Sequence, residues 1–209
     1  MSSSRRALVV VDVQNEYFDG PLEIQYPPRE ESLAAVVRAL DVAAEHDLPV
    51  VLVQHERPQG AFVPGTPGFE VHAAVEGRAA ESWKRVTKDK GSVFAGTDVA
   101  SWLEGHGVDT ITLVGFMTNN CIIASAAAAE ERGLAAEVLA DATGAIHLAN
   151  EAGKVSAQQV HESLLVLLQS NFAAVATTED WAAAVKADDA LAKSDLGTSA
   201  MQGRAAFDQ

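Results

Sequence analysis

The chain is poor in cysteine, with Cys121 alone among 209 residues. A single thiol cannot form a disulfide within one chain, nor can it supply a metal site built from several thiolates. The sequence therefore suits a reducing compartment.

Positive charge is also scarce. The chain has 15 Lys and Arg residues against 29 Asp and Glu, which gives a net charge of -14 at pH 7. Such a balance repels phosphate backbones and anionic lipid surfaces. We therefore expect neither nucleic acid nor a membrane as a partner.

Long apolar runs are missing as well. None approaches the ~20 residues that a membrane-spanning helix needs, and the first six residues lead directly into a strand-like segment without the apolar centre of a secretory leader. We found no internal repeat, low-complexity segment or interdomain linker. With 48% hydrophobic and 21% charged residues, the sequence predicts a soluble cytoplasmic protein. We expect one domain over residues 1–187 and a tail of mixed polarity over residues 188–209.

Apolar runs and helical spacing alternate along the chain. Residues 7–11 are continuously apolar and β-branched, which is typical of a strand buried on both faces, and Ser32 can cap a helix that ends near Pro49. Further strands are predicted at 50–53, 83–87, 110–114, 136–139 and 172–176, and further helices at 98–104, 120–132, 149–169 and 178–187. Proline and glycine make residues 54–77 a long loop, of a kind that is usually functional.

This alternation predicts an α/β fold of three layers, α/β/α, with a mostly parallel sheet of about six strands. In such sheets the functional groups gather beyond the carboxyl ends of the strands. Asp12 and the turn from Gly115 to Cys121 both follow strand ends.

Cys121 is predicted to lie at the first turn of a helix. Unpaired N–H groups and the helix dipole at this position favour thiolate, so we expect a lowered thiol pKa and a nucleophilic role. The alternative is a buried structural cysteine, since free cysteine is among the most buried residue types.

Three motifs decide between these interpretations. Asp12 lies in a D-x-Q-N context, Lys88 is followed by Phe94 and Gly96-Thr97, and Cys121 ends a G-x-x-T-x-x-C turn. Over residues 7–180 this pattern resembles the isochorismatase-like cysteine hydrolases, which include nicotinamidases and N-carbamoylsarcosine amidohydrolases.

The resemblance implies the isochorismatase-like hydrolase fold and a catalytic triad of Asp12, Lys88 and Cys121. Taken singly, Asp12 could cap a turn and Lys88 could be a surface charge. Lys90 is the rival to Lys88, but its offset from the Gly-Thr pair does not fit the family pattern.

A thiol near its ordinary pKa of ~8.5 needs a base and a cation to become a nucleophile at neutral pH. The resemblance assigns Asp12 as the base and later the acid, and Lys88 as the electrostatic partner. It also implies a cis peptide bond before Met117, which turns the Met117 and Cys121 N–H groups into an oxyanion hole. The implied reaction is attack on an amide, loss of ammonia or an amine, and hydrolysis of a thioester.

No metal or other cofactor is expected. Nicotinamidases bind a divalent metal through an Asp-x-His element after the second strand, where this chain has Gln54 in place of the carboxylate. His55 and His72 remain, which is not enough for such a site, and the difference also argues against nicotinamide as the substrate.

The expected substrate is a small-molecule amide, carbamoyl compound or lactam. Tyr17, His55, Phe94 and Asn119 are candidates to bind it, although Phe94 could equally be core packing. The resemblance also implies a homodimer or homotetramer, and residues 126–129 offer a small-residue helical surface for contact.

Two alternative functions stay open. One is vinyl-ether hydrolysis that uses Asp12 without covalent catalysis. The other is an acidic binding protein that has kept the fold without turnover.

Overall fold

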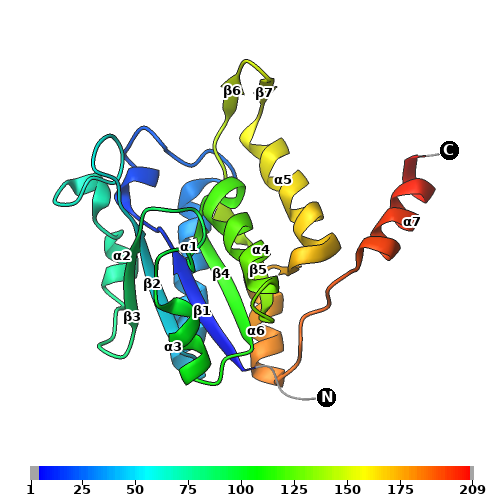
Figure 1. Cartoon of the computed structure of the whole chain (residues 1–209), viewed down its shortest axis with the longest axis horizontal. Coiled ribbons are helices and arrows are strands. Elements are labelled where there is room, and N and C mark those ends of the chain that lie inside the picture. The colour runs from blue at the N-terminus through cyan, green and yellow to red at the C-terminus, as the bar shows by residue number, and fades with distance from the viewer. Residues whose placement is uncertain (1–4, 208–209) are drawn as a thin grey trace.

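The computed structural model describes residues 5–207; residues 1–4, which begin the segment examined for a leader, and residues 208–209, the end of the expected tail, lie outside the described residues. Its centre is a six-stranded, all-parallel sheet with the order β3-β2-β1-β4-β5-β8 (Figure 1). The strands are β1 (Arg6–Val11), β2 (Val50–His55), β3 (Lys84–Lys88), β4 (Thr110–Phe116), β5 (Ala135–Gly144) and β8 (Ala174–Ala176). The parallel sheet confirms the predicted fold class.

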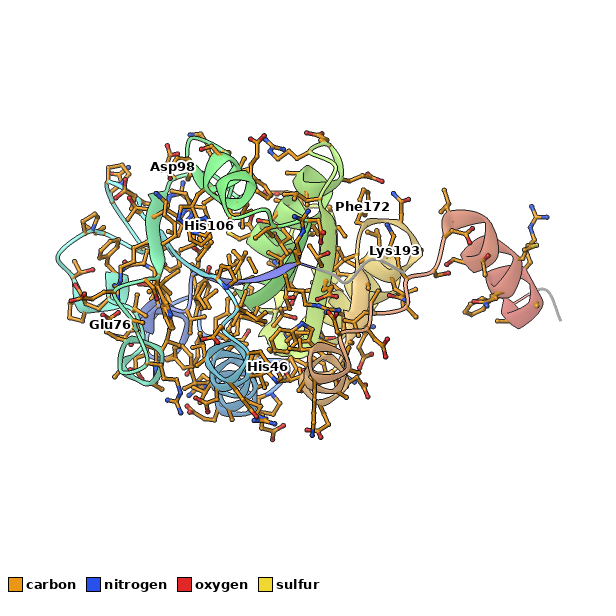
Figure 2. All side chains as sticks on the ribbon, turned by 90° about the horizontal axis from the view of Figure 1, so that it is seen from below. His46, Glu76, Asp98, His106, Phe172 and Lys193 are labelled. Atoms are coloured by element: carbon orange, nitrogen blue, oxygen red, sulfur yellow. The ribbon has the colours of Figure 1, made fainter. Side chains whose placement is uncertain are left out.

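Helices cover both faces of this sheet, as Figure 2 shows from below. The α-helices are α1 (Arg29–Glu45), α2 (Ala73–Glu76), α3 (Val99–Gly105), α4 (Ile123–Glu130), α5 (Ala157–Leu167), α6 (Thr178–Ala187) and α7 (Leu196–Phe207). Short 3-10 and π-helical turns are η1 (Asn15–Tyr17), η2 (Pro67–Phe69), η3 (Thr118–Ile122) and η4 (Leu168–Phe172).

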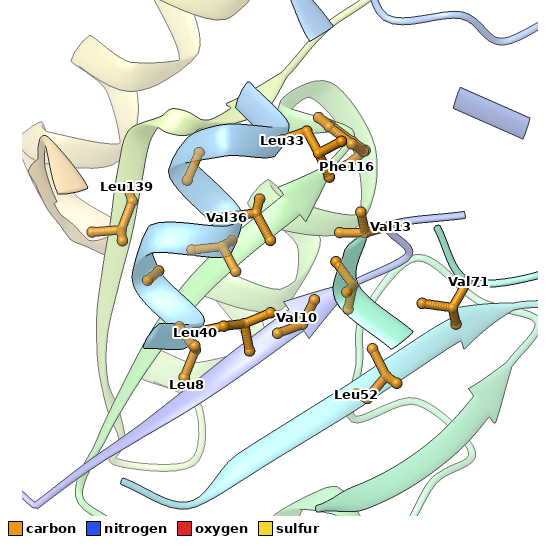
Figure 3. Packing of buried hydrophobic residues seen from close by; sticks show 14 of the residues in the cluster. Leu8, Val10, Val13, Leu33, Val36, Leu40, Leu52, Val71, Phe116 and Leu139 are labelled. Atoms are coloured by element: carbon orange, nitrogen blue, oxygen red, sulfur yellow. The ribbon is translucent and has the colours of Figure 1, made fainter. Parts of the chain in front are cut away.

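The alternation of side chains along β1 builds two cores, one on each face of the sheet. Leu8 and Val10 pack with α1, whose Leu33, Val36 and Leu40 point down onto the sheet (Figure 3). On the opposite face, Ala7, Val9 and Val11 pack in a second cluster together with residues of α3 and α4. Because β1 is buried on both faces, its carboxyl end is held firmly in the centre of the sheet.

Several segments differ from the sequence prediction, and the stretch 54–77, expected as a loop, contains η2 and the short helix α2. The helix expected over 149–169 is preceded by an antiparallel hairpin, β6 (Leu148–Asn150) and β7 (Gly153–Val155), so that α5 begins only at Ala157. The expected tail contains the helix α7. In the hairpin, Gly153 has a positive φ of 141°, which interrupts a helix despite the helix-forming alanines around it.

The start of α1 was also predicted at the wrong residue. The helix begins at Arg29 after Pro28, and Ser32 does not cap it but lies buried inside the helix. Pro28, with its fixed φ, is the N-cap instead, so the helix starts four residues earlier than a Ser32 cap would place it.

At the amino end of the strands, a buried ion pair joins distant parts of the chain. Arg6 donates to Glu137 from Nη2 at 2.8 Å and also to the Asp189 carbonyl at 2.6 Å. Trp181 of α6 donates from Nε1 to Glu137 at 3.1 Å, and the Thr112 hydroxyl donates to the same carboxylate at 2.7 Å. The network thus connects β1, β4, β5 and α6.

Within residues 5–207, no helix combines the length and the apolar character that crossing a membrane requires.

Candidate active site

Asp12 follows the central strand directly and has a left-handed backbone, with φ at 53°. Its N–H donates to the Val53 carbonyl of β2 at 2.9 Å, and its side chain is fully buried. On the other side, Gly115 of β4 approaches so closely that a Cβ there would overlap the Val11 carbonyl. The tight spacing of β1 and β4 brings the carboxylate toward the turn after β4.

Lys88 is the last residue of β3, and its side chain is also fully buried. The ammonium donates to Asp12 Oδ2 at 2.6 Å and to Cys121 Sγ at 3.2 Å, and lies 3.2 Å from His55 Nδ1. The three N–H groups of the Lys88 ammonium thus have three acceptors, one each on Asp12, Cys121 and His55. The rival Lys90 is exposed and pairs with its neighbour Asp89 at 2.9 Å.

Cys121 lies in η3, a π-helical turn between β4 and α4, and is buried. The expectation of a lowered thiol pKa is wrong. Burial, followed by the negative charge of Asp12, raises the pKa of the Cys121 thiol to about 12, although Lys88 acts in the opposite direction. Desolvation of the thiolate therefore outweighs the favourable electrostatics of the helix start.

The Asp12 carboxyl has one occupied and one available oxygen. Oδ2 accepts from Lys88, while Oδ1 is buried and has no hydrogen-bond partner among the described residues. Burial raises the pKa of Asp12 above 3.8, and the Lys88 charge limits that rise. A carboxylate oxygen of Asp12, a ring nitrogen of His55 and the Cys121 sulfur lie within 4.8 Å of one another. The Asp12 carboxyl is thus close to the Cys121 thiol.

The turn before the cysteine contains a cis peptide bond between Phe116 and Met117, as the resemblance implied. The following Thr118 is held by a buried histidine of α5. Thr118 Oγ1 and His161 Nδ1 are 2.9 Å apart, and His161 Nε2 is 3.1 Å from the Ala140 carbonyl. Because a carbonyl only accepts, Nε2 carries the proton, and Nδ1 accepts from the threonine hydroxyl.

Sequence reasoning missed His161. Its only signal was a histidine among the apolar residues of a predicted helix. Burial lowers the pKa of His161, which keeps the ring neutral and preserves this arrangement.

Three of the four predicted substrate-binding residues lie around this group. His55 contacts Lys88, and burial and the Lys88 charge lower its pKa to about 4. Tyr17 is buried, and its pKa is raised well above 10 by desolvation and then by the charges of Asp12 and Cys121. Asn119 lies in η3, and its buried Oδ1 has no partner among residues 5–207.

An aromatic side chain that the sequence did not single out joins this group. Phe62, from the long loop, packs against Tyr17 at a ring distance of 5.1 Å and against His55 at 5.3 Å. Its backbone has a positive φ of 59°, an uncommon conformation for phenylalanine. The spacing of prolines and glycines predicts a loop here but does not predict that the Phe62 ring packs beside Tyr17 and His55.

Phe94, the fourth candidate, is buried. Its ring is part of the core cluster that contains α3 and α4, and the Arg132 guanidinium lies over it at 4.8 Å. Arg132 follows the carboxyl end of α4, whereas Cys121 precedes the amino end of that helix. The Phe94 side chain thus packs in a core cluster that also contains Cys121, and its role in substrate binding stays a prediction.

The residues do not fit the metal of nicotinamidases. The Gln54 side chain donates to the Phe69 carbonyl at 3.1 Å, and His72 Nδ1 accepts from the Ala74 N–H at 3.2 Å at the start of α2. Both groups are therefore engaged in loop structure. The cluster of Asp12, His55 and Cys121 surrounds the Lys88 ammonium, which supplies the positive charge there.

Comparison with known proteins agrees with this architecture. The isochorismatase domain profile matches residues 6–180. The chain is 32% identical over 177 residues to YddQ, an uncharacterized isochorismatase family protein of Bacillus subtilis strain 168, covering 83% of this chain and 96% of that protein. It is 31% identical to a nicotinamidase/pyrazinamidase of Mycobacterium tuberculosis, covering 68% of this chain and 87% of the other.

A solved structure extends the similarity to the whole chain. The crystal structure of a proposed isochorismatase of Burkholderia xenovorans LB400 superimposes with a TM-score of 0.96 at 43% identity, covering 100% of both chains. With the domain profile and the sheet topology, this similarity identifies the protein: the chain belongs to the isochorismatase family of hydrolases.

Proposed function

We propose that the chain is a cysteine-dependent hydrolase that cleaves a C–N bond of a small amide, carbamoyl compound or lactam through a thioester. The observation that carries the proposal is the buried Lys88 ammonium, which contacts both the Asp12 carboxylate and the Cys121 sulfur. A relative named nicotinamidase/pyrazinamidase supports amide hydrolysis. The metal-binding element that the resemblance implies for nicotinamidases has Gln54 in place of its carboxylate here, so we propose an amide other than nicotinamide as the substrate.

The raised thiol pKa indicates how the nucleophile forms. With a pKa of about 12, Cys121 is protonated in the resting protein, and Asp12 is the group placed to receive its proton. Transfer from Sγ to the free carboxylate oxygen leaves a thiolate beside the Lys88 ammonium and a neutral carboxyl. The total charge of the buried site stays constant, which avoids the cost of adding a charge to a desolvated site.

Acylation follows from this proton position. The thiolate attacks the amide carbon, and the oxygen charge that develops is stabilised by the N–H groups of Met117 and Cys121. The neutral Asp12 carboxyl then gives its proton to the leaving nitrogen as the C–N bond breaks, and ammonia or an amine departs. The product at this stage is a thioester on Cys121.

Deacylation reverses the roles. Asp12 accepts a proton from water, the resulting hydroxide adds to the thioester carbonyl, and the C–S bond breaks to give the acid. The sulfur regains a proton from Asp12. His55 acts as a positioning residue by accepting from Lys88, while Asn119 Oδ1 accepts a substrate N–H and Tyr17 forms part of the pocket wall.

The proposal also includes the cellular location and the oligomeric state of the enzyme. We place it in the cytoplasm as a homodimer or homotetramer. The helical surface first considered for subunit contact is partly unavailable, because Ala126 and Ala129 are fully buried in the core of their own chain.

The test is a panel of primary amides, carbamoyl compounds and lactams, assayed for ammonia or amine release. We expect Cys121→Ala to abolish release while the fold is retained, and intact-mass measurement of the wild type to trap a thioester adduct. Turnover near the wild-type rate in Cys121→Ala would overturn the proposal. Vinyl-ether hydrolysis that survives alkylation of Cys121 by iodoacetamide would support the alternative instead.

A further inference from the structure

The C-terminal helix α7 contacts the rest of its own chain only sparsely, mainly at η4. Figure 1 shows it set apart from the sheet and the other helices, at the end of an extended connection from α6. None of its residues is buried, and three large apolar side chains are exposed, Leu196 at 65%, Met201 at 68% and Phe207 at 88%. Exposure of this kind in a segment outside the family domain, which ends at residue 180, indicates a contact surface.

The intrinsic stability of α7 is too low to explain a separate helix. It has 12 residues, among them two glycines, Gly197 and Gly203, and isolated helices below ~12–15 residues are marginal in water. Asp195 caps the helix by accepting from the Thr198 N–H at 2.9 Å. A cap fixes where the helix starts but supplies only ~1 kcal/mol, so tertiary contact must support the rest.

A groove of about 820 Å³ lies between α7 and the carboxyl end of α5. On the α5 side it begins with Leu165 and Val166, and Val166 is 72% exposed. On the α7 side it is lined by Ser199, Gln202, Gly203 and Ala206, which recur at helical spacing. The small side chains among them, Ser199, Gly203 and Ala206, let a second helix approach closely.

Charge favours a second copy of this chain at the groove. Two bodies with a net charge of -14 each repel one another. Neither α7 nor the groove lining contains any of the 29 acidic residues, and Arg204 and Lys193 are the charged residues there. Electrostatic repulsion between two copies of the negatively charged chain is therefore weakest at this neutral to weakly cationic surface.

The structure from Burkholderia xenovorans supports a defined position for this helix. Its match covers 100% of both chains with a TM-score of 0.96, so that chain carries α7 in the same placement. A helix with so few contacts to its own chain has a defined position when another molecule also contacts it. A second copy offers the same groove and the same helix, which makes the contact self-complementary.

We propose that two copies of this chain exchange their C-terminal helices, each α7 lying in the groove between α5 and α7 of the other. A helix of this length is about 18 Å long and about 10 Å wide, so half of its surface is on the order of 300 Å². Two helices and two acceptor surfaces then bury roughly 1,200 Å², above the ~1,000 Å² that a specific interface needs.

The test is the particle mass by light scattering at micromolar concentration, for the wild type and three single variants. Val166→Glu and Gly203→Glu each place a carboxylate in the groove from one side. Val155→Glu is the matched control, because Val155 is an exposed valine on the hairpin, outside the groove. We expect the wild type and the control to have at least twice the 22.0 kDa mass, and each groove variant to have half the wild-type mass.

Circular dichroism of all four proteins serves as the check on folding, which the exposed position of Val166 should leave intact. A wild type of 22.0 kDa would overturn the exchange. Groove variants that keep the wild-type mass would also overturn it, since the subunit contact would then lie elsewhere. Dissociation of the Val155→Glu control together with the groove variants would remove the assignment to α7.

Discussion

Replacing Lys88 by methionine is the most informative perturbation of the site. The change keeps a similar chain length but removes the ammonium that donates to Asp12 at 2.6 Å and to Cys121 at 3.2 Å. Removing one partner of a buried ion pair costs about 3–5 kcal/mol, because the remaining charge is left unpaired. We expect a loss of that size in the free energy of unfolding of Lys88→Met near neutral pH.

The loss should depend on pH in a defined direction. Burial already raises the pKa of Asp12, and Lys88 is the largest influence that lowers it. Without Lys88 the carboxyl pKa rises further, so the folded state is penalised at any pH above the ordinary carboxyl pKa, where the unfolded chain is ionised. The difference between wild type and variant should therefore be largest at about pH 8 and shrink as the pH falls toward about 4.

The assay is urea unfolding followed by tryptophan fluorescence at about pH 5 and about pH 8. The matched control is Lys90→Met, two residues away, where an exposed pair with Asp89 should change stability by no more than ~0.5 kcal/mol. A loss below ~1 kcal/mol for Lys88→Met at the higher pH, or an equal loss at both, would refute the electrostatic account of the site.

Three further predictions follow from the same geometry. Because the pKa of His55 is about 4, His55→Gln should lower turnover without changing how turnover depends on pH between 5 and 8. A changed pH dependence in that range would mean that His55 titrates there. With a thiol pKa of about 12, alkylation of Cys121 by iodoacetamide should accelerate roughly tenfold per pH unit from pH 7 to 10, and a plateau near 8.5 would contradict burial of the thiol. Gly115→Ala should lower the free energy of unfolding, measured by thermal unfolding, by about 1–3 kcal/mol or more, because Gly115 has a φ of 104° and the added Cβ would overlap the Val11 carbonyl. The control Gly105→Ala, where the added Cβ has open space, should not destabilise the protein.

The sequence was most informative where strands end. The apolar run before Asp12 and the run before Gly115 each predict a buried parallel strand, and the carboxyl ends of neighbouring parallel strands share one edge of the sheet. Lys88 was harder to place, because the strand before it is only partly buried, and the choice over Lys90 depended on motif spacing. The proposed triad of Asp12, Lys88 and Cys121 was thus predicted from the resemblance to the family, and the rule for strand ends supports the positions of Asp12 and Cys121.

The remaining features depend on tertiary contacts that local patterns do not contain. His161 reaches Thr118 across 43 positions only because α5 packs beside η3. The thiol pKa of Cys121 is set by burial and by the Asp12 carboxylate, which follows another strand. The local sequence at the start of a helix contains neither influence. The helix in the expected tail is short and contains glycine, so propensity alone gave no reason to predict it.

The ion pair between Arg6 and Glu137 has a consequence for the order of events during synthesis. Arg6 belongs to the first strand to be made, yet its guanidinium also donates to the carbonyl of Asp189, and Glu137 accepts from Trp181. A nascent chain that ends before residue 181 therefore leaves this buried carboxylate short of a donor. We expect the sheet to reach its final packing only after α6 has left the ribosome, because the buried carboxylate beside the first strand needs a donor from that helix.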